Sequence, residues 1–254
     1  MKNIVNLVRR NDPDRFLACL FAPPERRNTL FLLSAFNHEI ARAREVTSQP
    51  MLALIRLQWW RETVQGVRRN HDVAGPLGDA VAQRALDQDD LLAMIAARET
   101  EADDAMPDLA SWHRYLADSA GGWAVAAGRV LGANGEQIDR LRKLGTAYGV
   151  ATQLANVVAW ARRDRCMLPD DVLTAHGLSR EQVIQDPHRA RLARPELAKM
   201  GLALCDAGRG SFPRTIIAAA LPSVLAQRDL KRGMRFRGIA DKVAVLGAVI
   251  RAKV

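Results

Sequence analysis

The chain has 254 residues, of which 48% are hydrophobic and 26% are charged. This composition excludes an intrinsically disordered chain and supports a buried core. The formal net charge is +9. This charge is compatible with a basic solvated surface or with binding to a phosphate-bearing ligand, an anionic membrane or a nucleic acid, and alone it does not distinguish these cases.

Helix signals follow one another along the chain, and the alternation typical of strands is hard to find. Asp12-Pro13 predicts an N-cap with proline in the first turn, and Pro23-Pro24 predicts the start of a helix that ends at about Val46. Ser48 opens the next predicted helix, and Gly75-Pro76 predicts a break. Further helices are predicted over residues 77–87, 89–103, 108–131 and 135–164.

The last third of the chain continues the helical pattern. We predict a short helix at Leu168-Pro169-Asp170-Asp171 that runs to Ala175, and further helical segments from 179, over 189–209 and 213–228, and from about 239 to the end. No repeat or linker interrupts them, so we expect one all-α domain over residues 1–254. The final stretch is mildly amphipathic. Packing on the bundle is favoured over contact with a membrane surface.

Cysteine usage and the start of the chain bear on the compartment. Cys19, Cys166 and Cys205 form no Cys-x-x-Cys pair, which argues against a structural zinc site and for reduced thiols. The first residues carry no secretory signal, and no apolar run reaches the ~20 residues of a membrane span. We therefore expect a cytoplasmic protein. A nucleic-acid partner is not expected, because no helix-turn-helix signature accompanies the charge.

Several segments together carry the signature of a known enzyme family. They are residues 34–37 (Ser-Ala-Phe-Asn), 57–62 (Leu-Gln-Trp-Trp-Arg-Glu), 149–158, 168–171 (Leu-Pro-Asp-Asp), and 218–222 behind Arg214. Over roughly residues 11–230 the chain resembles the squalene/phytoene synthase family. The resemblance implies an isoprenoid-synthase-like helical bundle around a central cavity, in which two prenyl diphosphates are joined head to head.

Active members of that family need two acidic clusters on facing helices. Carboxylates at i and i+4 share a helix face and hold Mg²⁺, while substrate phosphates complete the octahedral coordination. The first cluster, Asp-Asp-x-x-Asp, falls on Ala41, Arg42 and Glu45 in this sequence, and the second, Asp-x-x-x-Asp, falls on Trp160 and Asp164. One carboxylate on each side is too few for a set of Mg²⁺ ions, and a guanidinium at Arg42 repels them.

Spacing gives a second departure from the family pattern. Leu168 follows Asn156 by twelve residues, about four fewer than in active members, so roughly one helical turn is missing. If the gap falls after Asp164, that residue is the retained second acid. If the gap falls earlier, Asp164 and Arg165 replace the family's Gly-Arg and no acid survives.

Residues 36–41, with Ser48-x-Pro50-Met51, resemble one degenerate branch of the family in particular. That branch includes a mitochondrial assembly factor of respiratory complex I. It implies a non-enzymatic, membrane-peripheral role at the inner membrane with respiratory-complex subunits as partners, and no cofactor. The alternative is an active Mg²⁺-dependent prenyltransferase acting on farnesyl or geranylgeranyl diphosphate.

Arginines near the lost metal positions suggest a different ligand chemistry. Guanidinium groups bind phosphate oxygens without a metal, so an isoprenoid diphosphate or a phospholipid is a candidate ligand. The candidate ligand-binding residues are Arg42, Arg61, Gln153, Asn156 and Arg165. For the arginines the alternative is a solvated surface, and for Gln153 and Asn156 it is buried hydrogen bonding between helices. Gly121-Gly122 either gives a substrate room or lets two helices pack closely.

Overall fold

The computed structural model describes residues 1–47, 49–103, 105–233 and 237–254. These residues form helices and short 3₁₀ segments, with no strand among them. In chain order the elements are α1 (Lys2–Asn11), α2 (Pro13–Leu20), α3 (Pro24–Glu45), α4 (Pro50–Val64), α5 (Ala74–Ala82), α6 (Gln88–Glu99), η1 (Thr100–Asp103), α7 (Leu109–Val130), α8 (Gly135–Ala155), α9 (Val157–Ala161), α10 (Asp170–Ala175), α11 (Arg180–Gln185), η2 (Pro187–Arg191), α12 (Arg194–Gly208), η3 (Ile217–Ala219), α13 (Pro222–Arg232) and α14 (Ile239–Arg251).

Side-chain caps set several helix starts where the sequence predicts them. The Asp12 carboxylate accepts a hydrogen bond from the backbone N–H of Arg15, with Pro13 in the first turn of α2. Asn134 and Ser179 each form a capping box at the start of α8 and α11. These caps satisfy backbone donors that the first helical turn leaves without a partner.

Other predicted boundaries are wrong. Pro76 lies inside the first turn of α5, where its missing N–H costs no hydrogen bond, so α5 continues through residues 75–76. In place of the helix predicted over 213–228, the chain forms the short η3 segment first, and α13 then runs from Pro222 to Arg232. The helix predicted over 189–209 likewise divides into η2 and α12. Gln49 is the N-cap of α4, and the predicted start at Ser48 lies outside the described residues.

The predicted helix over 135–164 ends early, and this difference shapes the candidate site. α8 stops at Ala155, Asn156 interrupts it, and α9 ends at Ala161. The chain then turns tightly, with Asp164 in the left-handed region at φ 56°. Asp tolerates this conformation better than most residues. The turn brings residues 163–165 back toward the end of α3.

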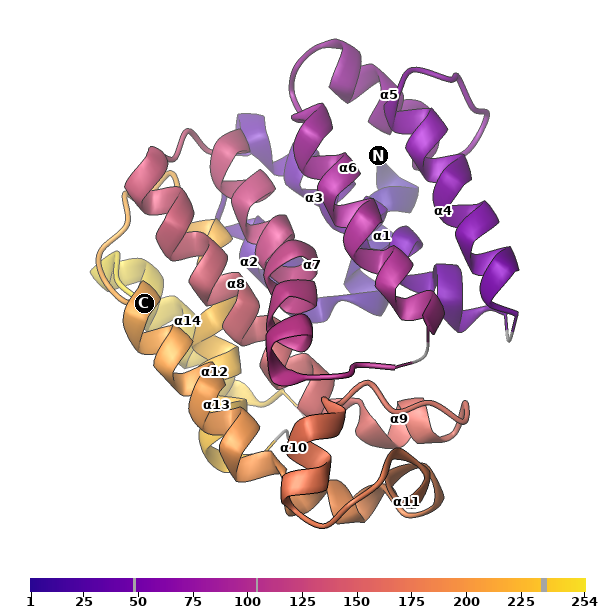
Figure 1. The fold of residues 1–254 in the computed structure, drawn as a ribbon. Coiled ribbons are helices and arrows are strands. Elements are labelled where there is room, and N and C mark those ends of the chain that lie inside the picture. The colour runs from indigo at the N-terminus through magenta and orange to yellow at the C-terminus, as the bar shows by residue number, and fades with distance from the viewer. Residues whose placement is uncertain (48, 104, 234–236) are drawn as a thin grey trace.

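α7 and α8 pack side by side at the centre of the bundle (Figure 1). Glycines let their backbones approach: a Cβ on Gly145 would lie 2.7 Å from the Ala120 carbonyl oxygen and 2.7 Å from the Ala124 Cβ. A Cβ on Gly121 would lie 2.9 Å from Thr146 Oγ1. The small residues of α7 therefore serve close helix packing, the second of the two interpretations of Gly121-Gly122.

We expect Gly145→Ala to lower the free energy of unfolding by about 1–3 kcal/mol, because the added methyl overpacks the α7–α8 contact. Gly78→Ala in α5 is the matched control, since a Cβ there meets no heavy atom within 4 Å. Helix propensity alone should then raise stability by about 0.5–1 kcal/mol. Urea unfolding measures both changes, and a loss of equal size at the two positions would contradict the packing argument.

The buried apolar side chains form two groups, and each group includes part of this helix pair. One joins α1–α6, the C-terminal half of α7 and the N-terminal half of α8 with η3, α13 and α14, and includes the buried rings of Phe36, Trp60 and Trp123. The other joins the N-terminal half of α7 and the C-terminal half of α8 with α9–α13. Along the described stretches no helix is both long and apolar enough to cross a bilayer.

Candidate functional site

The end of α3 and the turn after α9 enclose a pocket of about 510 Å³. This pocket is where the two degenerate motifs come together. Glu45, the third position of the first motif, and Asp164, the last position of the second, both line it. The full lining is Arg44, Glu45, Val46, Thr47, Arg163, Asp164 and Arg165.

Three arginines and two carboxylates give this pocket a net positive lining. Arg44 donates to the Thr47 carbonyl oxygen at 2.6 Å, and buried Arg165 donates to the Glu101 carbonyl oxygen at 2.7 Å. Burial raises the pKa of the Glu45 carboxyl, although the nearby Arg163 guanidinium lowers it. The pocket therefore favours an anion over a cation.

The lining does not fit the Mg²⁺ of active prenyltransferases. Magnesium needs octahedral oxygen coordination with carboxylates aimed at one point. Ala41 and Trp160 supply no oxygen ligand, and in the described part of the chain no cluster of three or more His, Cys, Asp or Glu could hold a metal ion. The side chains around this pocket therefore do not suit the metal on which prenyl transfer depends.

The remaining predicted residues lie outside the pocket. Arg42 is on the surface of α3, with its side chain 43% exposed and its Nη1 atom 3.8 Å from the Glu39 carboxylate. Arg61 on α4 forms an ion pair with Glu99 at the end of α6. Asn156 is half-buried at the interruption between α8 and α9. Its backbone carbonyl oxygen accepts a hydrogen bond from the backbone N–H of Trp160 at 2.9 Å.

Gln153 and Trp160 belong to a buried hydrogen-bond network. The Trp160 indole N–H donates to Gln153 Oε1 at 3.0 Å, and Gln153 Nε2 donates to the Tyr115 hydroxyl at 3.3 Å. Tyr115 donates in turn to Glu101 Oε1 at 2.6 Å, and Arg98 donates to the same oxygen at 2.6 Å. The network thus joins α6, η1, α7, α8 and α9 through the interior.

This network links Trp160, a position of the second motif, to the buried carboxylate of Glu101. Glu101 is 1% exposed, and burial beside its charge raises the pKa of the Tyr115 phenol. The enclosed pocket beside Gln153 and Trp160 is too narrow to admit a water molecule. For Gln153 the geometry matches the alternative of hydrogen bonding between buried helices.

Arg98, Glu101 and Tyr115 were not among the residues that the sequence singled out. Arg98 and Glu101 are three residues apart, the spacing of an ion pair on one helix face. That local signal does not say whether the pair is buried. Only burial makes it an internal network rather than a solvated surface pair.

Comparison with known proteins places the chain in a family. The family model described as squalene/phytoene synthase matches residues 8–234. The chain belongs to the squalene/phytoene synthase family. Two solved structures show the same fold. One is a dehydrosqualene synthase in complex with a ligand, with a TM-score of 0.80, 14% identity, and coverage of 98% of this chain and 95% of that one.

The second is a squalene synthase from Alicyclobacillus acidocaldarius, with a TM-score of 0.74, 18% identity and 91% of each chain covered. The predicted all-α isoprenoid-synthase-like bundle is therefore confirmed.

Curated relatives of this family member carry a different description from the solved synthases. Assembly factor 6 of NADH dehydrogenase (ubiquinone) complex I from Bos taurus is 28% identical over 230 residues, which cover 87% of this chain and 68% of the relative. The Homo sapiens protein of the same name is 27% identical over 236 residues, covering 89% and 70%. The predicted resemblance to the degenerate branch is confirmed.

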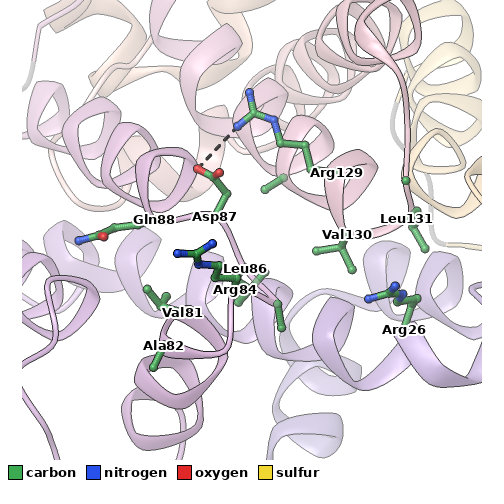
Figure 2. Close-up of a pocket in the computed structure, with 13 residues that line it drawn as sticks. Arg26, Val81, Ala82, Arg84, Leu86, Asp87, Gln88, Arg129, Val130 and Leu131 are labelled. Carbon is green, nitrogen blue, oxygen red and sulfur yellow. Dashed lines mark ion pairs between the residues drawn. The ribbon is translucent and has the colours of Figure 1, made fainter.

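A second pocket of this squalene/phytoene synthase family member lies between the turn after α5 and the C-terminal end of α7 (Figure 2). Its volume is about 580 Å³, and Arg26, Arg84 and Arg129 are part of its lining. Arg129 Nη1 lies 2.6 Å from an Asp90 carboxylate oxygen and 3.7 Å from one of Asp87. None of the predicted site residues lines this pocket, and it is separate from the degenerate motifs.

Proposed function

We propose that this protein is a non-catalytic member of the squalene/phytoene synthase family that assists the assembly of respiratory complex I. The observation that carries the proposal is the state of the catalytic centre. Arginines surround the two remaining motif carboxylates, Glu45 and Asp164, and a closed side-chain network occupies the interior beside them. The curated relatives named as complex I assembly factors support the same role.

The proposal includes a place in the cell and a ligand class. The protein acts as one domain in the cytoplasm, peripheral on the inner membrane, with respiratory-complex subunits as partners. Its α3–α9 pocket takes the phosphate group of an isoprenoid diphosphate or a phospholipid, with Arg163 and Arg165 as guanidinium donors. Arg42, Arg61, Gln153 and Asn156 stay predictions as ligand contacts.

We expect no pyrophosphate release above the buffer rate when the protein is incubated with farnesyl or geranylgeranyl diphosphate and Mg²⁺. The reason is that neither motif supplies the paired carboxylates that stabilise the leaving pyrophosphate through a metal. An EDTA sample gives the background, and an active squalene synthase is the positive control. Turnover that depends on Mg²⁺ would establish the prenyltransferase alternative instead.

The assembly role needs a separate test in the source cell. Deletion of the gene should reduce assembled complex I on native gels and its NADH dehydrogenase activity, while the other respiratory complexes keep their levels. Normal complex I in the deletion strain would overturn the assembly proposal, whatever the result of the pyrophosphate assay.

A further inference from the structure

The outward face of α14 exposes a row of large apolar side chains. The row follows spacings of four, three and four residues, which place its members on one side of the helix. Its members are Ile239 (81% exposed), Val243 (59%), Leu246 (47%) and Ile250 (65%). Val245 and Ala248, on the opposite side of the helix, are buried in the core. The helix therefore has two apolar faces, of which the bundle covers one.

Contacts at both ends hold α14 in this orientation. Near its start, Arg228 Nε donates to Asp241 Oδ1 at 2.7 Å. Beyond its end, Val254 exchanges backbone hydrogen bonds with Gly210, at 3.3 and 3.2 Å. These contacts and the buried face orient the helix so that the exposed row faces away from the bundle.

The exposed charged residues of α14 and of the short segment after it are all positive. Lys242 and Arg251 are exposed on α14, and the exposed Lys253 follows its C-terminal end. The one acid of α14, Asp241, lies toward the bundle, where it is bound to Arg228 and to the Gly238 N–H. An apolar row with basic flanks is the pattern of helices that lie in the interface of an anionic bilayer.

We propose that α14 is the surface by which this protein binds an anionic phospholipid bilayer. Its apolar row enters the boundary between headgroups and acyl chains, and Lys242, Arg251 and Lys253 lie at the phosphate level. This inference rests on the membrane-peripheral location proposed above and names α14 as the helix that makes the contact with the membrane.

Charge complementarity favours a bilayer over a second copy of this chain. Two copies that met through α14 would bring the same basic flanks together, and each chain carries a net charge of +9. A bilayer rich in anionic lipid offers the opposite charge along the whole helix. Lipid molecules can also rearrange around the exposed apolar row, whereas a protein partner would need a matching groove.

Vesicle co-sedimentation with paired variants tests the inference. The apolar variant is Val243→Ser/Ile250→Ser, and the charge variant is Lys242→Gln/Lys253→Gln. Met51→Ser/Ile55→Ser is the matched control, because these α4 residues are 66% and 57% exposed and α4 lies on the far side of the bundle from α14 (Figure 1). All six residues are exposed, so folding should persist, and thermal unfolding checks it.

The wild type should bind phosphatidylglycerol-containing vesicles more tightly than vesicles of phosphatidylcholine alone. The apolar variant should lose at least tenfold in partitioning. The charge variant should lose roughly fivefold for each Lys removed, and only with the anionic vesicles. The control should stay within twofold of the wild type.

Three results would overturn the inference. If the wild type binds neither kind of vesicle, both the α14 surface and the membrane-peripheral placement are wrong. If the wild type and the apolar variant bind equally well, only the assignment to α14 is wrong. A dimer in sedimentation velocity that the apolar variant dissociates would make this face an interface between copies. The complex I assembly phenotype is a separate readout, so its failure is distinguishable from all three.

Discussion

Glu101→Gln should lower the free energy of unfolding by about 3–5 kcal/mol, since it removes the counter-charge of the largely buried Arg98. Glu101 is 1% exposed, and its Oε1 atom accepts hydrogen bonds from Arg98 and Tyr115, both at 2.6 Å. Glutamine keeps the size of the side chain and one acceptor oxygen. The loss therefore reports the charge rather than a cavity.

Glu99→Gln provides the matched control for this measurement. Glu99 also pairs with an arginine, Arg61, but the two side chains are 38% and 26% exposed. Solvent screens such a pair, so its loss should cost under about 1 kcal/mol. Urea denaturation of both variants gives the comparison. If the two substitutions cost the same, the interior network is not what holds this end of the bundle together.

Arg237→Met should cost a similar amount, about 3–5 kcal/mol, because it leaves two neighbouring carboxylates without a cation. Arg237 donates to both oxygens of Asp14, at 2.8 and 2.6 Å, and to both oxygens of Asp229, each at 2.8 Å. Although burial opposes its charge, these carboxylates raise the pKa of the guanidinium. The bonds tie α2, α13 and the segment before α14 together.

The triple variant Arg237→Met/Asp14→Asn/Asp229→Asn separates charge from packing. With no unpaired carboxylate left, more than half of the lost stability should return. Urea unfolding of the single and triple variants gives the two values. A triple variant as unstable as the single one would show that the methylene packing of Arg237, and not its ion pairs, provides the stability.

Local patterns predicted much of the secondary structure of this chain. Asp12 and Ser179 act as caps because each capping side chain accepts a hydrogen bond from a backbone N–H only three residues further along the chain. The loss of metal ligands was equally local, since Ala41 and Arg42 stand where the family motif has acids. The early end of α9 was not predicted. It depends on a left-handed residue, Asp164, within an otherwise helical pattern.

The sequence by itself determined the helical class, the family and the disappearance of the paired carboxylates, because each is written in residues that are neighbours along the chain. Only the tertiary structure decided what replaced the catalytic centre. Trp160 reaches Glu101 through Gln153 and Tyr115, across four helical elements, and Arg237 meets Asp14 across 223 positions. Such pairs form when folding buries charged and polar groups together, since an unpartnered one would be costly in the interior. No local spacing encodes that choice.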